Sequence, residues 1–271
     1  MHFSQVDVFT AELMYGNPVA VAHDGAALSD EQMAAFARWT NLSETTYLLP
    51  PTDPAADYRL RIFTPFGELP FAGHPTLGSA RAWLAAGGVP AQDGRLVQEC
   101  AAGLVRIRDR DGRLAFAAPP LRRGGPVDEA DIERLASGLG LARADVVDAQ
   151  WADNGPGWIA LLLASADAVL AVDPSGLPST EKVGIVGPCA SGSPTDFEVR
   201  AFFPGGEDPV TGSLNAGIAQ WLIGSGRTPD SYIASQGTKL GRRGRVHVDR
   251  LGDDIWIGGE TVVGITGEVA L

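Results

Sequence analysis

Apolar and polar positions alternate with a period of two over much of the chain, which predicts many short strands. In the first half we expect strands at FSQVDVF (3–9), VAVA (19–22), TTYLL (45–49), YRLRIF (58–63) and three short segments within 96–119. In the second half we expect strands at 157–172 and 196–203, followed by YIASQG, RVHV, DIWIGG and TVVGITGEVAL. The pattern indicates an α+β fold with a mainly antiparallel sheet.

Two segments show the period of an amphipathic surface helix. In LSDEQMAAFARWTN (28–41), Ser29 is placed to cap the helix and Gln32 to complete a capping box. The apolar stripe of this helix consists of Met33, Phe36 and Ala37. The second segment, DEADIERLASGLG (128–140), has the same character.

Two further segments have the composition of buried helices. They are TLGSARAWLAA (76–86), which stops before Gly87-Gly88, and TGSLNAGIAQWL (211–222). Their only charged residue is Arg81, and helices without a charged face are buried. Because most of their side chains are small, we expect a strongly curved sheet to approach and enclose each helix.

Each of these helices follows a polar, glycine-rich turn, TPFGELPFAGHP (64–75) and GGEDPV (205–210). The first N–H groups of a helix have no acceptor within it, so both N-termini are candidate sites for a carboxylate or an enolate oxygen. The alternative is that Thr76, Thr211 or Ser213 caps its own helix. The sequence alone leaves both interpretations open.

The repeated order of strands, turn and small-residue helix indicates two similar halves. PPLRRGGP (119–126) is the best candidate for the linker, which places the halves at 1–118 and 119–271. An internal duplication explains the repeat. Two unrelated α+β domains remain the alternative.

Composition restricts the partners and the location. The 21 basic and 33 acidic side chains give a net charge of −12, which opposes binding to nucleic acid or to an anionic membrane. Cys100 and Cys189 fit neither a metal site nor a disulfide framework, and MHFSQVDVF is not a signal peptide. The longest apolar run, WIALLLA (158–164), is too short to span a bilayer. We therefore expect a cytoplasmic protein without membrane or nucleic-acid partners.

Three residues are candidates for chemistry. Glu44 lies at the entrance of an expected buried strand, where a carboxylate is costly unless it is paired or functional. His74 lies at the mouth of a buried helix, although a lone histidine is also common in a core. Asp208, in GGEDPVTG, is either functional or a capping residue. No motif for a phosphate loop, dinucleotide, zinc ion or nucleophilic serine is present, so acids and a histidine without a cofactor suggest proton transfer.

Five segments resemble the PhzF-like isomerases, named for phenazine biosynthesis, within the diaminopimelate epimerase fold superfamily. They are QVDVFTAELMYGNPVAV (5–21), NLSETTYLL (41–49), RIFTPFGELPFAGHPTLGSA (61–80), FFPGGEDPVTGSLNAGIAQWL (202–222) and QGTKLGRRGRVHV (236–248). The resemblance implies two halves, each a barrel-like sheet around a central helix, with the active site in the cleft between them. It also implies that a C-terminal strand, about 260–271, returns to the first half. A homodimer is implied as well.

The resemblance further implies roles for individual residues. Glu44, in the N-L-S-E-T motif, would move a proton between carbons of a small conjugated substrate bearing a carboxylate. His74 and Asp208 would position the substrate and assist proton delivery. The implied substrate contacts come from Ser43, Gly73, Thr211, Gly212 and Ser213, with no metal and no cofactor.

The segment GRRGR (241–245) differs in sequence from the PhzF-like relatives, which often have Pro and Ser at these positions. The contacts of this loop, and with them the exact substrate, are therefore not predicted by the resemblance.

Two other functions fit the same residues. An amino-acid epimerase or racemase would use Glu44 and Asp208 as opposed bases, although the cysteine pair of the epimerase relatives is absent. A binding protein of the same fold would keep the cleft without turnover. The presence of Glu44, His74 and Asp208 together argues against the binding protein.

Overall fold

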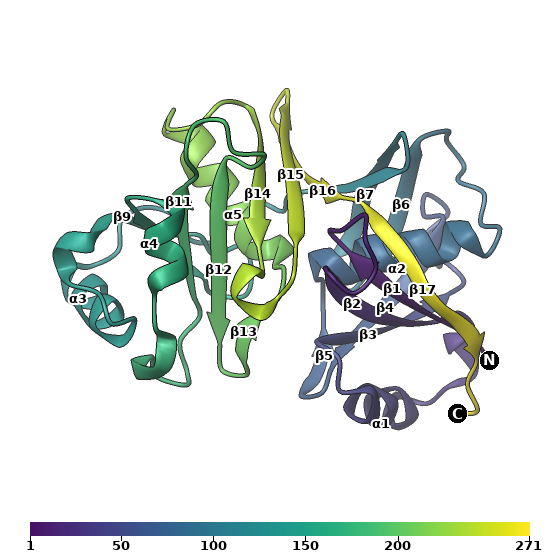
Figure 1. The fold of residues 1–271 in the computed structure, drawn as a ribbon. Coiled ribbons are helices and arrows are strands. Elements are labelled where there is room, and N and C mark those ends of the chain that lie inside the picture. Colours follow the sequence, from purple (N-terminus) through teal and green to yellow (C-terminus); the bar gives the residue numbers. More distant parts are fainter. The chain divides into compact units, whose positions relative to one another are not determined.

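The computed structural model describes all 271 residues, and the chain divides into two compact units. Unit 1 comprises Met1–Ala117 and Gly258–Leu271, whereas unit 2 comprises Ala118–Ile257. The fold is mixed α/β, with many short strands and few helices (Figure 1). None of the helices has the length and apolar character needed to cross a bilayer.

Unit 1 is built on one run of paired strands in the order β17-β1-β2-β3-β4-β6-β7-β8, with β5 on β4. The N- and C-terminal strands therefore lie side by side (Figure 1). The strands are β1 (His2–Val8), β2 (Asn17–Ala22), β3 (Glu44–Leu49), β4 (Tyr58–Thr64), β5 (Gly67–Leu69), β6 (Arg95–Cys100), β7 (Gly103–Arg110), β8 (Arg113–Ala117) and β17 (Thr261–Glu268). The helices are α1 (Asp30–Thr40) and α2 (Gly73–Ala85).

Unit 2 pairs its strands in the order β9-β10-β11-β12-β14-β15, with β13 on β12. The strands are β9 (Val146–Trp151), β10 (Ile159–Leu163), β11 (Val183–Pro188), β12 (Phe197–Phe203), β13 (Gly206–Asp208), β14 (Ser231–Gln236) and β15 (Gly244–Leu251). The helices are α3 (Glu129–Gly138), α4 (Ala166–Ala171) and α5 (Gly212–Gly224). Strand β16 (Asp254–Gly259) carries the chain across the boundary between the units.

The two units repeat the same series of strand directions. In unit 1 the pairs β1/β2, β2/β3, β3/β4, β4/β6 and β6/β7 are antiparallel, parallel, antiparallel, parallel and antiparallel. In unit 2 the pairs β9/β10, β10/β11, β11/β12, β12/β14 and β14/β15 follow the identical series. Such agreement in topology supports an internal duplication more strongly than the sequence does.

The repeat extends to an ion pair in the hairpin that precedes each small-residue helix. Arg61 on β4 contacts both carboxylate oxygens of Glu68 on β5 at 2.7 Å. Arg200 on β12 contacts both oxygens of Glu207 on β13 at 3.0 and 2.9 Å. Each guanidinium also lies about 5 Å from a phenylalanine ring two residues further along its strand. These bidentate pairs hold the turn that leads into the helix.

Helix α2 is buried along most of its length, as its composition predicts. It contacts β1, β2, β3, β4, β8 and β17, and its residues from Gly73 to Ala80 are all buried. Gly78 is needed for this contact, since a Cβ there would lie 2.2 Å from a methyl carbon of Val19. The helix begins three residues earlier than the expected 76–86 segment, so His74 and Pro75 belong to its first turn, where a proline is tolerated.

Helix α5 is buried in the same way. A Cβ at Gly217 would lie 2.4 Å from the carbonyl oxygen of Ala152, which follows β9. On the strand side, Gly184 in β11 makes room for Leu214, because a Cβ there would lie 2.3 Å from a methyl carbon of that side chain. Close approach of helix and strands therefore depends on small residues on both sides.

The capping box and the apolar stripe predicted for α1 are confirmed. Ser29 accepts from the Gln32 N–H at 3.3 Å, and the Gln32 side chain accepts from the Ser29 N–H at 3.0 Å, which completes the capping box. Its apolar stripe of Met33, Phe36 and Ala37 is buried.

The expected strand at 157–172 is wrong in its second part. Strand β10 ends at Leu163, and Ser165 then caps helix α4 by accepting from the Ala168 N–H at 3.2 Å. Val169 of this helix packs into the core of unit 2. The apolar residues of 157–172 therefore do not alternate with a period of two, and the apolar run alone did not distinguish a strand from a buried helix. Strands β9 and β11 were not expected.

The contact at Gly217 generates a stability prediction. Gly217→Ala should lower the free energy of unfolding by about 1–3 kcal/mol, because its Cβ meets backbone that cannot move freely. Gly224→Ala at the end of the same helix is the control, since a Cβ there meets nothing within 4 Å. The control should keep the wild-type value or gain up to about 1 kcal/mol. Chemical denaturation measures both, and equal stability of the two variants would contradict the close contact.

Candidate active site

Glu44 and His74 are brought together in unit 1. Glu44 is the first residue of β3, paired in register with Val19 of β2, and His74 is in the first turn of α2. Atom Oε2 of Glu44 lies 3.3 Å from Nε2 of His74, and the two side chains are only 14% and 5% exposed. An acid and an imidazole predicted from separate motifs therefore form one buried pair.

His74 is neutral at physiological pH. Burial lowers the pKa of its ring to about 3, and a hydrogen bond with the Pro18 backbone opposes this only in part. The neutral ring does not hold the Glu44 carboxylate as an ion pair. It carries one ring proton, and Nε2 is the nitrogen that faces Glu44.

The turn before β2 orients this histidine. The amide nitrogen of Asn17, which is fully buried, lies 3.4 Å from Nδ1 of His74. The preceding Gly16 N–H donates to the Asp7 carboxylate at 3.2 Å, and a Cβ at Gly16 would lie 2.1 Å from the Val8 carbonyl oxygen. Sequence reasoning missed Asn17 and Asp7. The Gly-Asn-Pro turn after a polar strand residue was the available signal.

The N-terminus of α2 is not capped by a side chain. The N-cap residue, Ala72, has no capping group, and the Thr76 hydroxyl instead accepts from the Gln98 amide at 3.0 Å. Self-capping by Thr76 is therefore not used. The first-turn N–H groups of Gly73 and His74 adjoin the Glu44–His74 pair as donors for an anion.

Asp208 lies in unit 2 at the end of β13, beside the start of α5. Its carboxylate accepts from the Thr211 hydroxyl at 2.6 Å. Gln236 on β14 fixes this turn with four hydrogen bonds. Its side-chain oxygen accepts from the Thr211 N–H (3.0 Å) and the Asn215 amide (2.8 Å), and its side-chain nitrogen donates to the Asp208 carbonyl (3.1 Å) and the Thr211 hydroxyl (2.9 Å). Sequence reasoning missed this glutamine, because its partners are far away in the chain.

Thr211 and Ser213 do not cap α5 either. Thr211 is the N-cap residue but makes no capping hydrogen bond, since its hydroxyl is turned to Asp208 and Gln236. The Ser213 hydroxyl accepts from the indole N–H of Trp158 at 3.0 Å. The N–H groups of Gly212 and Ser213 thus remain helix-terminal donors, as in unit 1.

The remaining predicted residues occupy simpler positions. Ser43 directly precedes β3 and is half-buried, and Gly73 is the first residue of α2. The two cysteines are unpaired, and no three His, Cys, Asp or Glu side chains are grouped as metal ligands. The structure thus forms one group around Glu44 and His74 and another around Asp208. Their joint action on one substrate stays a prediction.

A buried carboxylate beside a neutral imidazole and an uncapped helix N-terminus is typical of enzymes that transfer protons. The chain matches the family model described as phenazine biosynthesis-like protein, PhzC-PhzF, over residues 6–267. It belongs to this family.

Individual proteins of similar sequence or structure support this family assignment. The chain is 34% identical to the trans-2,3-dihydro-3-hydroxyanthranilate isomerase of Pseudomonas aeruginosa, over 89% of this chain and 87% of that protein. It is 36% identical to antisense-enhancing sequence 1 of Schizosaccharomyces pombe, over 98% and 97% of the two chains. A PhzF-family crystal structure from Enterococcus faecalis aligns with a TM-score of 0.82 at 26% identity, covering 100% of this chain and 99% of that one. The family and the isomerase class predicted from the motifs are confirmed.

The burial of His74 generates a prediction about pH. An unfolded histidine titrates near 6.5, whereas the pKa of His74 in the folded protein is about 3. Between these values the unfolded chain binds more protons, so the folded state loses stability as the pH falls through this range. We expect His74 to account for a loss of about 2 kcal/mol in the free energy of unfolding between pH 7 and pH 5.

His74→Gln removes the titrating ring and should flatten the pH dependence by that amount, as measured by denaturation at the two pH values. The pKa of His23 is also lowered by burial, to about 4, and contributes the same slope to both proteins. The difference in pH dependence between the wild type and His74→Gln therefore reports the contribution of His74 alone. An identical slope in wild type and variant would contradict a buried neutral ring.

Proposed function

We propose that this PhzF-family protein is a cofactor-independent isomerase that moves a proton between two carbons of a small, conjugated, carboxylate-bearing substrate. Glu44 is the general acid/base. The observation that carries the proposal is the buried 3.3 Å contact between Glu44 and His74 at the start of α2. The substrate in the name of the Pseudomonas aeruginosa relative, trans-2,3-dihydro-3-hydroxyanthranilate, has the required carboxylate and conjugated ring.

The reaction begins when the Glu44 carboxylate removes a proton from a substrate carbon. The electron pair of the broken C–H bond moves into the conjugated system, and negative charge develops on the carboxylate or enolate oxygens. The N–H groups of Gly73 and His74 at the α2 terminus stabilise this charge, because their dipoles are fixed and need no reorganisation. Binding of the carboxylate there also orients the C–H bond toward Glu44.

The second step returns the proton. Glu44, now protonated, donates it to a different carbon, either directly or by way of Nε2 of His74. The electron pair leaves the conjugated system to form the new C–H bond, and the Glu44 carboxylate is regenerated. No electrons are gained or lost over the two steps, so the reaction needs no redox partner.

Asp208, Thr211, Gly212 and Ser213 provide the second set of proposed substrate contacts, and Ser43 adjoins Glu44. In this proposal Asp208 accepts hydrogen bonds from polar groups of the substrate. The amides of Gly212 and Ser213 bind a carboxylate or enolate oxygen. We also propose that each unit forms a barrel-like sheet around its buried helix; the matching series of strand directions supports this.

Replacement of Glu44 tests the assignment. With trans-2,3-dihydro-3-hydroxyanthranilate in deuterated water, the wild type should give product carrying solvent deuterium at the carbon that receives the proton. Glu44→Gln should reduce kcat by at least about 10²–10⁴-fold and remove the deuterium incorporation, because the amide cannot accept the proton. Mass spectrometry of the product measures the label.

Glu31→Gln is the matched control, since Glu31 is an exposed acid in the first turn of α1. It should exchange deuterium at the wild-type rate. The thermal midpoint of Glu44→Gln should show that the variant is folded. Wild-type exchange in a folded Glu44→Gln protein would eliminate Glu44 as the base.

A further inference from the structure

The first turn of α5 is held by the loop 152–158, which connects β9 to β10 and has no part in the mechanism described above. The side-chain amide of Asn154 donates to the Ser213 carbonyl oxygen at 2.8 Å. The indole N–H of Trp158 donates to the Ser213 hydroxyl at 3.0 Å. Asn154 and Trp158 are both buried. One loop therefore contacts both the backbone and the side chain of the second residue of the helix.

The backbone of this loop is fixed by its own hydrogen bonds. The Asp153 carboxylate accepts from the N–H groups of Gly155 and Gly157, both at 2.7 Å. The Ala152 N–H donates to the Trp158 carbonyl oxygen at 2.9 Å, which closes the loop at its two ends. The position of the indole relative to α5 is therefore set by a well-bonded backbone.

The direction of the Trp158 hydrogen bond decides what the Ser213 hydroxyl can do. An indole N–H only donates, so the hydroxyl oxygen must accept. The hydroxyl proton itself has no acceptor in the protein, and Ser213 is half-buried, so it can meet a ligand. The start of α5 then presents three donors, which are the N–H groups of Gly212 and Ser213 and the Ser213 O–H.

The corresponding loop of unit 1 makes the equivalent contact. Strands β1 and β2 match β9 and β10 in the repeated series, and the second residue of α2 is His74. Asn17, the first residue of β2, has its amide nitrogen 3.4 Å from Nδ1 of His74, and Trp158 directly precedes β10. Each unit therefore uses the same connection to contact the second side chain of its buried helix, which supports a positioning role for Trp158.

We propose that Trp158 is a positioning residue that makes the Ser213 hydroxyl a donor to the substrate. The α5 terminus then selects a group that only accepts hydrogen bonds, such as a carboxylate or an enolate oxygen, because its donors are fixed in advance. A carboxamide is disfavoured, since its NH₂ group would face donors only. This inference rests on the proposed function, which takes the α5 terminus as a substrate contact.

Calorimetry on the full-length protein tests the inference with benzoate and benzamide, which are not turned over and differ only in one oxygen replaced by NH₂. The wild type should bind benzoate at least about tenfold more tightly than benzamide. Ser213→Ala should weaken benzoate binding about tenfold, the value of one hydrogen bond to a charged group. Trp158→Phe keeps a ring but loses the N–H, and should weaken benzoate binding at least about threefold, because the hydroxyl is no longer oriented.

The double variant separates positioning from general loosening of the structure. In the Ser213→Ala background, Trp158→Phe should change the Kd of benzoate less than about twofold, because the indole acts only through the hydroxyl. A further threefold loss in that background would overturn the inference. Unchanged benzoate affinity in Trp158→Phe alone would also overturn it, as would equal affinity of the wild type for benzoate and benzamide.

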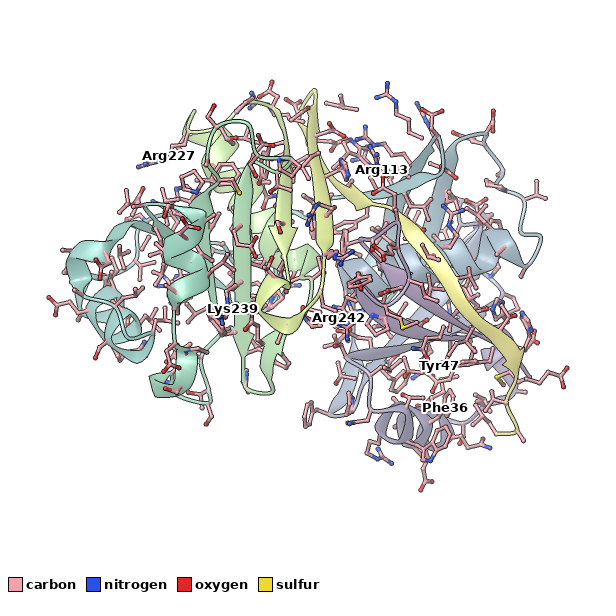
Figure 2. All side chains as sticks on the ribbon, in the orientation of Figure 1. Phe36, Tyr47, Arg113, Arg227, Lys239 and Arg242 are labelled. Atoms are coloured by element: carbon pink, nitrogen blue, oxygen red, sulfur yellow. The ribbon has the colours of Figure 1, made fainter.

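Trp221→Phe is the matched control, since Trp221 is a buried indole on the same helix, about 12 Å from Ser213 along its axis. The neighbouring Leu222 carbonyl accepts from the Arg227 N–H at 2.9 Å, and Arg227 lies at the end of unit 2 opposite β13 (Figure 2). The control should bind benzoate with wild-type affinity. A loss equal to that of Trp158→Phe would show that any missing indole has this effect and would contradict the inference.

Nuclear magnetic resonance of the indole N–H groups gives a second readout, in which the Trp158 signal is the one absent from Trp158→Phe. Saturation with benzoate should move this signal downfield, because a hydroxyl that donates to an anion becomes a stronger acceptor. The shift should be absent in Ser213→Ala. A Trp158 signal that does not respond to benzoate in the wild type would count against the positioning role.

These readouts are binding measurements, so failure of the isomerase chemistry gives a different result. Deuterium exchange by folded Glu44→Gln would overturn the proposed base without changing the affinities. Benzoate binding that is absent, or that does not depend on Ser213, would remove the α5 substrate contacts and this inference together. Binding that depends on Ser213 but not on Trp158 would remove only the role of Trp158.

Discussion

Close contact between a small-residue helix and the strands of its unit is the constraint on which this structure depends. Gly78 and Gly217 allow the backbone of α2 and α5 to approach to distances that any side chain would prevent. A buried helix must begin inside the protein, so its first N–H groups face the interior rather than bulk water. The same packing that stabilises the fold therefore creates two clusters of donors with no side-chain cap.

The chemistry differs between the two units although the framework is repeated. The hairpin with its Arg–Glu pair, the glycine at the first helical position and the glutamine bound to the first helical turn occur in both. At the second helical position, unit 1 has His74 whereas unit 2 has Ser213. At the end of the hairpin, unit 1 has Leu69 and unit 2 has Asp208. A duplicated scaffold therefore carries two different sets of polar groups.

Signals that are local in sequence predicted the fold well. The capping box of Ser29 and Gln32 and the composition of both buried helices depend on residues a few positions apart, and the structure agrees. The helix at 166–171 was missed because a short apolar run does not distinguish a strand from a buried helix, and only its cap, Ser165, decides. The pairing of Glu44 with His74 could be expected only from the family resemblance. Asn17 had only the Gly-Asn-Pro turn as a signal, and Gln236 had none, because its role arises from partners that only the folded chain brings near.

The placement of β17 against β1 affects the order in which the chain can fold. Unit 2 is one continuous stretch of chain, so all of its strands are synthesised before β17. Unit 1 begins with the first residues and must wait for the last, since β17 covers one side of β1 and contacts α2. The nascent β1 therefore exposes a hydrogen-bonding edge until β17 is made, and edges of this kind invite pairing with other chains. Completion of the first unit therefore depends on a strand that is made only after the whole of the second unit.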